Sequence, residues 1–95
     1  MSWRSDLGYW YSIANNCRDS LQDLYDRLGD VNADLAALHD RKDDPRLSKV
    51  QRDECWRQIK YRYEVRDEIR AEIERNKDER SQALDMINSI RSFRR

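Results

Sequence analysis

Thiol and imidazole side chains are scarce in this 95-residue chain, which has two cysteines, Cys17 and Cys55, and one histidine, His39. A thiolate can act as a nucleophile, and thiolates with imidazoles are the usual ligands of zinc. These three residues are widely separated and include no Cys-x-x-Cys pair. The chain also has no glycine-rich phosphate loop and no Ser/His/acid set. We therefore expect no enzymatic activity, and no metal ion, cofactor or small-molecule substrate.

Arginine supplies the other recognisable chemistry. Arg62, Arg66 and Arg70 follow one another at intervals of four residues, so on a helix they would lie near one another. Such a row of guanidinium groups could follow a phosphate backbone. Carboxylates are interleaved with the arginines, and pairs such as Asp53 with Arg57 are ordinary ion pairs of a solvated helix. We interpret the row as a candidate basic face, and nucleic-acid binding stays as an alternative function.

A heptad pattern determines which element positions these groups. From residue 3 to residue 38 every a and d position is apolar, and we call these positions the first seam. With 38% of the chain apolar, such a run arises by chance roughly once in ten thousand tries. The pattern predicts a long helix that packs against another helix. The first seam consists of Trp3, Leu7, Trp10, Ala14, Cys17, Leu21, Leu24, Leu28, Val31, Leu35 and Leu38.

The first helix is expected over about residues 3–39, with Ser2 as its N-cap. Residues 40–45 are polar except for the closing proline, and they are the predicted turn.

The second helix is expected over about residues 46–93, which contain no glycine or proline. Two starts are open. Pro45 after Asp44 is typical of the first helical position after an N-cap. Alternatively, Ser48 and Gln51 can form a capping box, which would start the helix three residues after Pro45.

The two halves of the chain carry opposite charge. Residues 1–45 hold five Lys/Arg and nine Asp, a net charge of −4, whereas residues 46–95 hold fourteen Lys/Arg and ten acidic residues, a net charge of +4. This asymmetry favours pairing of the halves with each other. The predicted fold is therefore all-α, a single domain over residues 1–95 with two long helices in an antiparallel coiled-coil-like hairpin.

Apolar flanks make the predicted core wider than a two-stranded zipper. The a and d positions of the second helix are half polar, but Trp56 and Tyr63 widen its apolar stripe. Tyr11, Ile13 and Tyr25 do the same for the first helix. A stripe this wide favours more than two helices, so we expect a homodimer that forms a four-helix bundle.

A reversal at residues 43 and 44 would pair Leu28 with Ile59 and place Trp10 over the polar stretch 74–82. The same register separates Cys17 from Cys55, so both are expected to be free thiols. It also leaves a C-terminal stripe without cover from the first helix, and this stripe is a candidate partner or dimer surface. The stripe consists of Leu84, Ile87, Ile90 and Phe93, beside the basic residues Arg91, Arg94 and Arg95.

In size and outline the chain is similar to the helical-hairpin substrates of type VII secretion. Tyr63 and Asp67 match the Tyr-x-x-x-Asp export signal of that family, although they lie in the middle of the predicted second helix. The family's turn carries Trp-x-Gly, and residues 40–47 contain neither Trp nor Gly. A secreted helical hairpin is therefore a second alternative.

No apolar run approaches the ~18 residues of a membrane span, and the N-terminus has no secretory apolar region. We expect a cytoplasmic protein without membrane contact. The predicted function is that of a small, non-enzymatic protein–protein interaction module. Its expected partners are a second copy of itself and an unidentified protein, for which it would act as adaptor, chaperone or stoichiometric inhibitor of the bacterial or phage accessory type.

Overall fold

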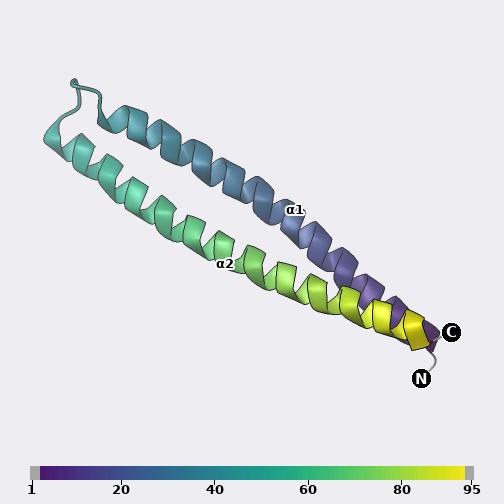
Figure 1. The fold of residues 1–95 in the computed structure, drawn as a ribbon. Helices are drawn as coiled ribbons and strands as arrows, with labels where there is room; N and C mark the ends of the chain where they lie inside the picture. Colours follow the sequence, from purple (N-terminus) through teal and green to yellow (C-terminus); the bar gives the residue numbers. More distant parts are fainter. Residues whose placement is uncertain (1–2, 94–95) are drawn as a thin grey trace. The chain divides into compact units, whose positions relative to one another are not determined.

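The computed structural model describes residues 3–93, which form two helices and no strand (Figure 1). Helix α1 spans Trp3–Lys42 and helix α2 spans Lys49–Phe93. The prediction of an all-α helical hairpin is confirmed. The N-cap predicted at Ser2, and the basic residues Arg94 and Arg95, lie outside the described residues.

The connection between the helices lies later in the chain than the sequence indicated, because α1 continues to Lys42 rather than ending near residue 39. In the loop, the Asp44 carboxylate accepts hydrogen bonds from the backbone N–H of Arg46 (2.9 Å) and from its guanidinium (3.1 Å). These bonds hold the pKa of Asp44 below its ordinary value. They also occupy Arg46 in the loop, where the sequence predicted the first turn of a helix.

The capping box is the start that α2 uses. The backbone N–H of Ser48 donates to Gln51 Oε1 (2.9 Å), and the backbone N–H of Gln51 donates to Ser48 Oγ (3.2 Å). This reciprocal pair satisfies two N–H groups at the start of the helix. Helix α2 therefore begins at Lys49, three residues after the predicted start at residue 46.

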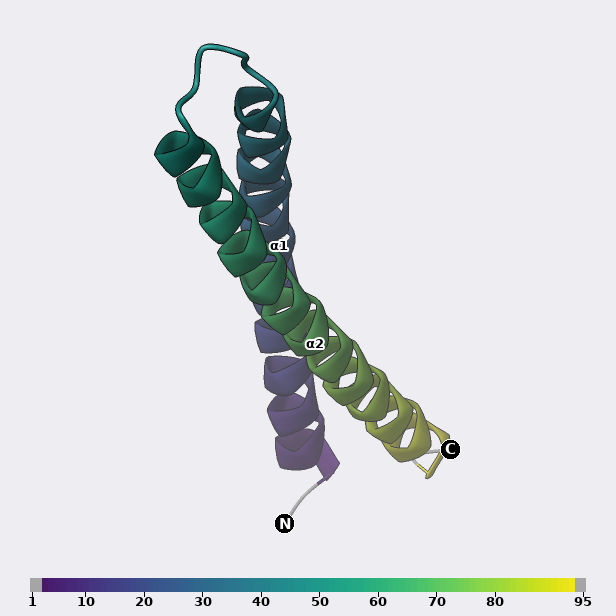
Figure 2. The same cartoon turned by 90° about the vertical axis from the view of Figure 1, so that its left-hand side faces the viewer.

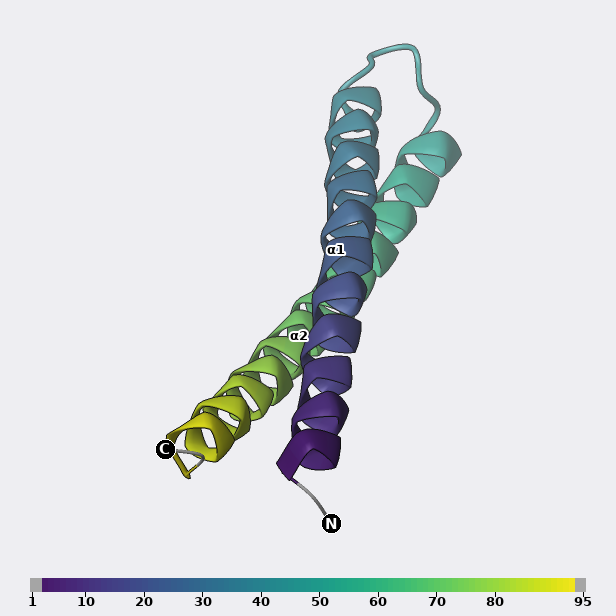
Figure 3. The ribbon, with the colours of Figure 1, turned by 90° about the vertical axis from the view of Figure 1, so that its right-hand side faces the viewer.

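The packing contacts divide the chain into two compact units, each with one segment of α1 and one of α2. The first unit comprises Met1–Leu24 and Glu72–Arg95, of which residues 3–24 and 72–93 are described; the second comprises Tyr25–Ala71. Within each unit the two segments run in opposite directions (Figures 2 and 3). That the 95 residues act as one domain stays a prediction.

Burial within each unit follows the a and d positions. In the first seam, only Trp3 is exposed, at 39%, and the other positions are buried or half-buried. In α2 the polar seam position Asn76 is half-buried, and its Nδ2 donates back to the carbonyl of Glu72 (2.9 Å). The buried residues are Ala14, Cys17, Leu24, Val31 and Leu35 on α1, and Cys55, Ile59, Ile69, Ile73, Ala83 and Ile87 on α2.

The predicted register is wrong. In the first unit, Trp10 packs with Leu7 against a buried cluster of Ala14, Ala83 and Ile87, and not over residues 74–82. In an antiparallel hairpin, the numbers of two facing residues add up to twice the residue number at the centre of the turn. If the turn lies one residue later, a given residue of the first helix therefore faces a residue two positions later on the second helix. The later turn therefore shifts the residues opposite α1 toward the C-terminus of α2. In the first unit, α1 covers Ile87 of the stripe that the sequence left open.

Leu24 provides the test of the first seam. Its side chain is 4% exposed, so Leu24→Ala should lower the free energy of unfolding by about 2–5 kcal/mol through lost burial and a cavity. Ala37→Ser, at an exposed position off the seam, should change it by no more than about 0.5 kcal/mol. Urea unfolding followed by circular dichroism measures both, and equal losses would contradict the seam assignment.

Candidate functional site

The two thiols are buried and reduced. Cys17 lies in the first unit and Cys55 in the second, and neither forms a disulfide. Burial raises the pKa of the Cys17 thiol above its ordinary value; the Glu79 carboxylate adds to the increase and the Arg80 guanidinium opposes it. Within residues 3–93, no group of three or more His, Cys, Asp or Glu residues is arranged to hold a metal ion. The thiols therefore belong to the helix packing.

Both thiols should be protected in the native protein. Because the thiolate is the reactive form, iodoacetamide at neutral pH should label Cys17 and Cys55 slowly in buffer and completely in denaturant without prior reduction. Intact-mass spectrometry counts the labels. Rapid labelling of Cys17 in the native state would contradict its burial.

The candidate basic face does not form one solvated surface. Arg62 and Arg66 are half-buried in the second unit, and the Nε atom of each is buried without a hydrogen-bond partner. Arg62 Nε lies 3.5 Å from a carboxylate oxygen of Asp34, while the Arg66 guanidinium lies over the Tyr63 ring, 4.5 Å from its centroid. Arg70 is exposed. Arg62 and Arg66 occupy a and d positions of α2, so helix pairing takes them partly out of solvent.

The C-terminal stripe is only partly open. Ile87 is 3% exposed in the cluster with Ala14, and Ile90 is half-buried, whereas Leu84 and Phe93 are exposed. Beside the stripe, Arg91 donates a hydrogen bond to the hydroxyl of Tyr11 and lies over its ring.

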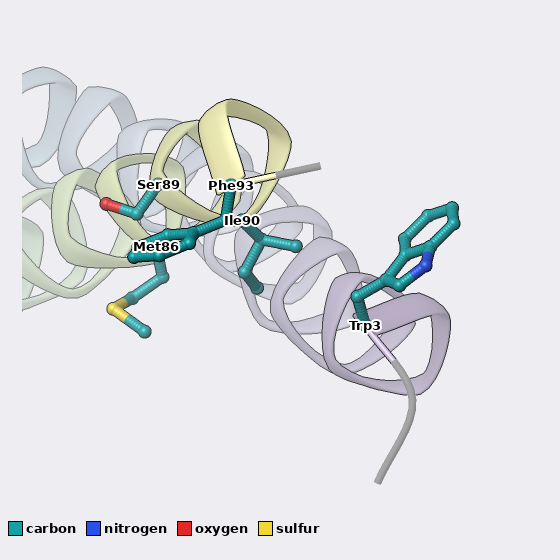
Figure 4. A pocket seen from close by; sticks show the side chains of 5 residues that line it. All are labelled: Trp3, Met86, Ser89, Ile90 and Phe93. Carbon is teal, nitrogen blue, oxygen red and sulfur yellow. The ribbon is translucent and has the colours of Figure 1, made fainter. Parts of the chain in front are cut away.

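An apolar hollow of about 310 Å³ lies at the end of the first unit (Figure 4). Trp3 contributes from the first turn of α1, and the other lining residues come from the last turns of α2. The Phe93 ring extends toward Met86, and the Trp3 indole points away from both (Figure 4). Phe93 is 93% exposed, whereas Trp3 and Met86 are 39% and 40% exposed. The lining residues are Trp3, Met86, Ser89, Ile90 and Phe93.

The second unit carries a group of stacked rings and cations that the sequence did not single out. A hydrogen bond of 3.1 Å joins His39 Nε2 on α1 to the Tyr63 hydroxyl on α2. The His39 ring meets the Trp56 ring edge-on at 6.4 Å, and Lys42 Nζ lies 5.3 Å from the centroid of Trp56. We call His39, Lys42, Trp56, Tyr63 and Arg66 the aromatic–cation cluster. Its sequence signal is the interval of seven between Trp56 and Tyr63, which places both rings on the same flank of the α2 seam.

No protein family model, curated protein or solved structure matches the chain. Neither α1 nor α2, over the described residues, has an apolar stretch sufficient to cross a membrane. A functional interpretation therefore depends on the two surfaces described above: the apolar hollow of the first unit and the aromatic–cation cluster of the second.

Proposed function

We propose that this chain is a small, non-enzymatic interaction module that assembles with a second copy and acts by binding another protein. The observation that carries the proposal is the apolar hollow, where Phe93, Met86 and Trp3 remain exposed beside the covered residue Ile87. Contiguous apolar surface of this kind is typical of a protein–protein contact.

A second copy is the occupant that the packing favours. The buried cluster of the first unit is built on two alanines and Ile87, and none of the large side chains in residues 3–93 is completely buried. Two helices alone bury one narrow stripe each, and small chains of this kind gain stability by oligomerising. A two-fold dimer would place each hollow against the corresponding surface of the other copy and complete a four-helix bundle.

The proposed cellular role is one that small dimeric helical hairpins can perform. A dimeric hairpin of this type would serve as an adaptor, chaperone or stoichiometric inhibitor in the cytoplasm. Nucleic-acid binding by the arginine row is the weaker candidate, because Arg62 and Arg66 are half-buried in the seam and carboxylates accompany the row along α2. No observation on Tyr63 or Asp67 favours the secreted hairpin, since Tyr63 is hydrogen-bonded to His39 within the second unit.

Charge placed in the hollow should separate the copies. We expect light scattering to give a dimer mass for the native chain at micromolar concentration and a monomer mass for the double variant Met86→Asp with Phe93→Asp. Both side chains are exposed in the single chain, so the helical signal at 222 nm should be retained. The physical reason is the cost of burying a carboxylate without a partner.

The matched control is Tyr9→Asp, which changes another exposed ring of the first unit outside the hollow. It should leave the dimer intact. A native chain that is monomeric throughout the micromolar range would contradict the homodimer. A double variant that stays dimeric would show that the dimer interface does not include the hollow.

A further inference from the structure

The aromatic–cation cluster has the composition of a binding hot spot. Tryptophan, tyrosine and arginine are the residues enriched among the side chains that dominate interface energies. Trp56 is 54% exposed and Tyr63 is 37% exposed, yet both are held in place through His39. The hydrogen bond to Tyr63 and the edge-on contact with Trp56 connect both rings to His39 within the single chain. Such preorganisation reduces the entropy cost of binding.

Arg66 gives the cluster a specific ligand chemistry. Its guanidinium lies over the Tyr63 ring. Among the described residues, no carboxylate lies within ion-pair distance of Arg66. The ammonium group of Lys42, in contrast, is paired with Asp43 at 2.9 Å while it lies over Trp56. A half-buried guanidinium without an anionic partner favours a ligand that brings a carboxylate.

The geometry distinguishes an acidic protein segment from a single-stranded nucleic acid. Nucleic-acid stacking uses open ring faces, and here Arg66 already occupies one face of Tyr63 and Lys42 one face of Trp56. A carboxylate can bind the cations where they lie, without displacing them from the rings.

We propose that the aromatic–cation cluster binds an acidic segment of a partner protein, with a carboxylate on Arg66 and an apolar side chain against the exposed edges of Trp56 and Tyr63. This inference rests on the proposed function, because it names the chemistry of the protein partner. It does not depend on the dimer, because the cluster lies in the second unit and the apolar hollow lies in the first.

The experiment uses fluorescence anisotropy with the full chain and three labelled probes. The first is a helical peptide with Glu and Leu on one face, the second is the same peptide with Gln in place of Glu, and the third is a single-stranded oligo-dT. The Glu peptide should bind saturably and more weakly as salt is raised. Its affinity should exceed that of the Gln peptide by about tenfold or more.

Two variants locate the binding. Arg66→Gln and, separately, Trp56→Ala should each weaken binding of the Glu peptide about tenfold. The matched control Arg70→Gln removes a neighbouring exposed charge and should change the affinity less than about twofold. Because Arg66 is half-buried, its variant is checked by thermal melting, and Trp56→Ala tests the same surface through an exposed ring.

Equal affinity for the Glu and Gln peptides, or unchanged binding by both Arg66→Gln and Trp56→Ala, would overturn the inference. Tight oligo-dT binding that these variants abolish would overturn it too, in favour of a nucleic-acid surface. Light scattering on the same samples separates the two proposals. A dimer that fails to bind the Glu peptide contradicts only the acidic partner, whereas a monomer that binds it contradicts only the homodimer.

Discussion

The packing of α1 against α2 along their a and d positions is the interaction on which the rest of the structure depends. It removes apolar side chains such as Leu24, Ile59 and Ile87 from water, and burial of apolar surface is the main favourable term in folding. The buried set also includes two alanines and two cysteines. A seam of this size holds two helices together while leaving aromatic rings on both units exposed, so the same packing that forms the hairpin also creates its binding surfaces.

The loop decides which residues meet along the seam. A heptad repeat alone allows the helices to slide by whole heptads, because each shift restores an a and d match. The Ser48–Gln51 capping box and the Asp44–Arg46 hydrogen bonds set the point at which the chain reverses. In the first unit Ile87 packs against Ala14, which divides the C-terminal stripe into a covered part and an open part.

The seam arginines show how helix pairing changes the role of a residue. An apolar residue at Arg62 or Arg66 would pack more simply, since buried charges cost free energy unless they are paired. Arg62 approaches Asp34, and Arg66 lies over Tyr63. Arg62 also lies over the Tyr61 ring, so the two arginines differ in that only Arg62 approaches a carboxylate. The arrangement of Arg66 leaves a guanidinium available to an anionic partner.

The sequence by itself determined the fold class, because an unbroken heptad from Trp3 to Leu38 and the absence of glycine and proline from residues 46–93 leave only long paired helices. It also contained both possible starts of α2. The choice between them is made by local hydrogen bonds of Asp44 with Arg46 and of Ser48 with Gln51. Only the tertiary structure decided which residues meet across the helices, and in the first unit it packs Ile87 against Ala14. The aromatic–cation cluster joins His39 to Trp56 and Tyr63 on the other helix, so its members become neighbours only when the loop has set the register.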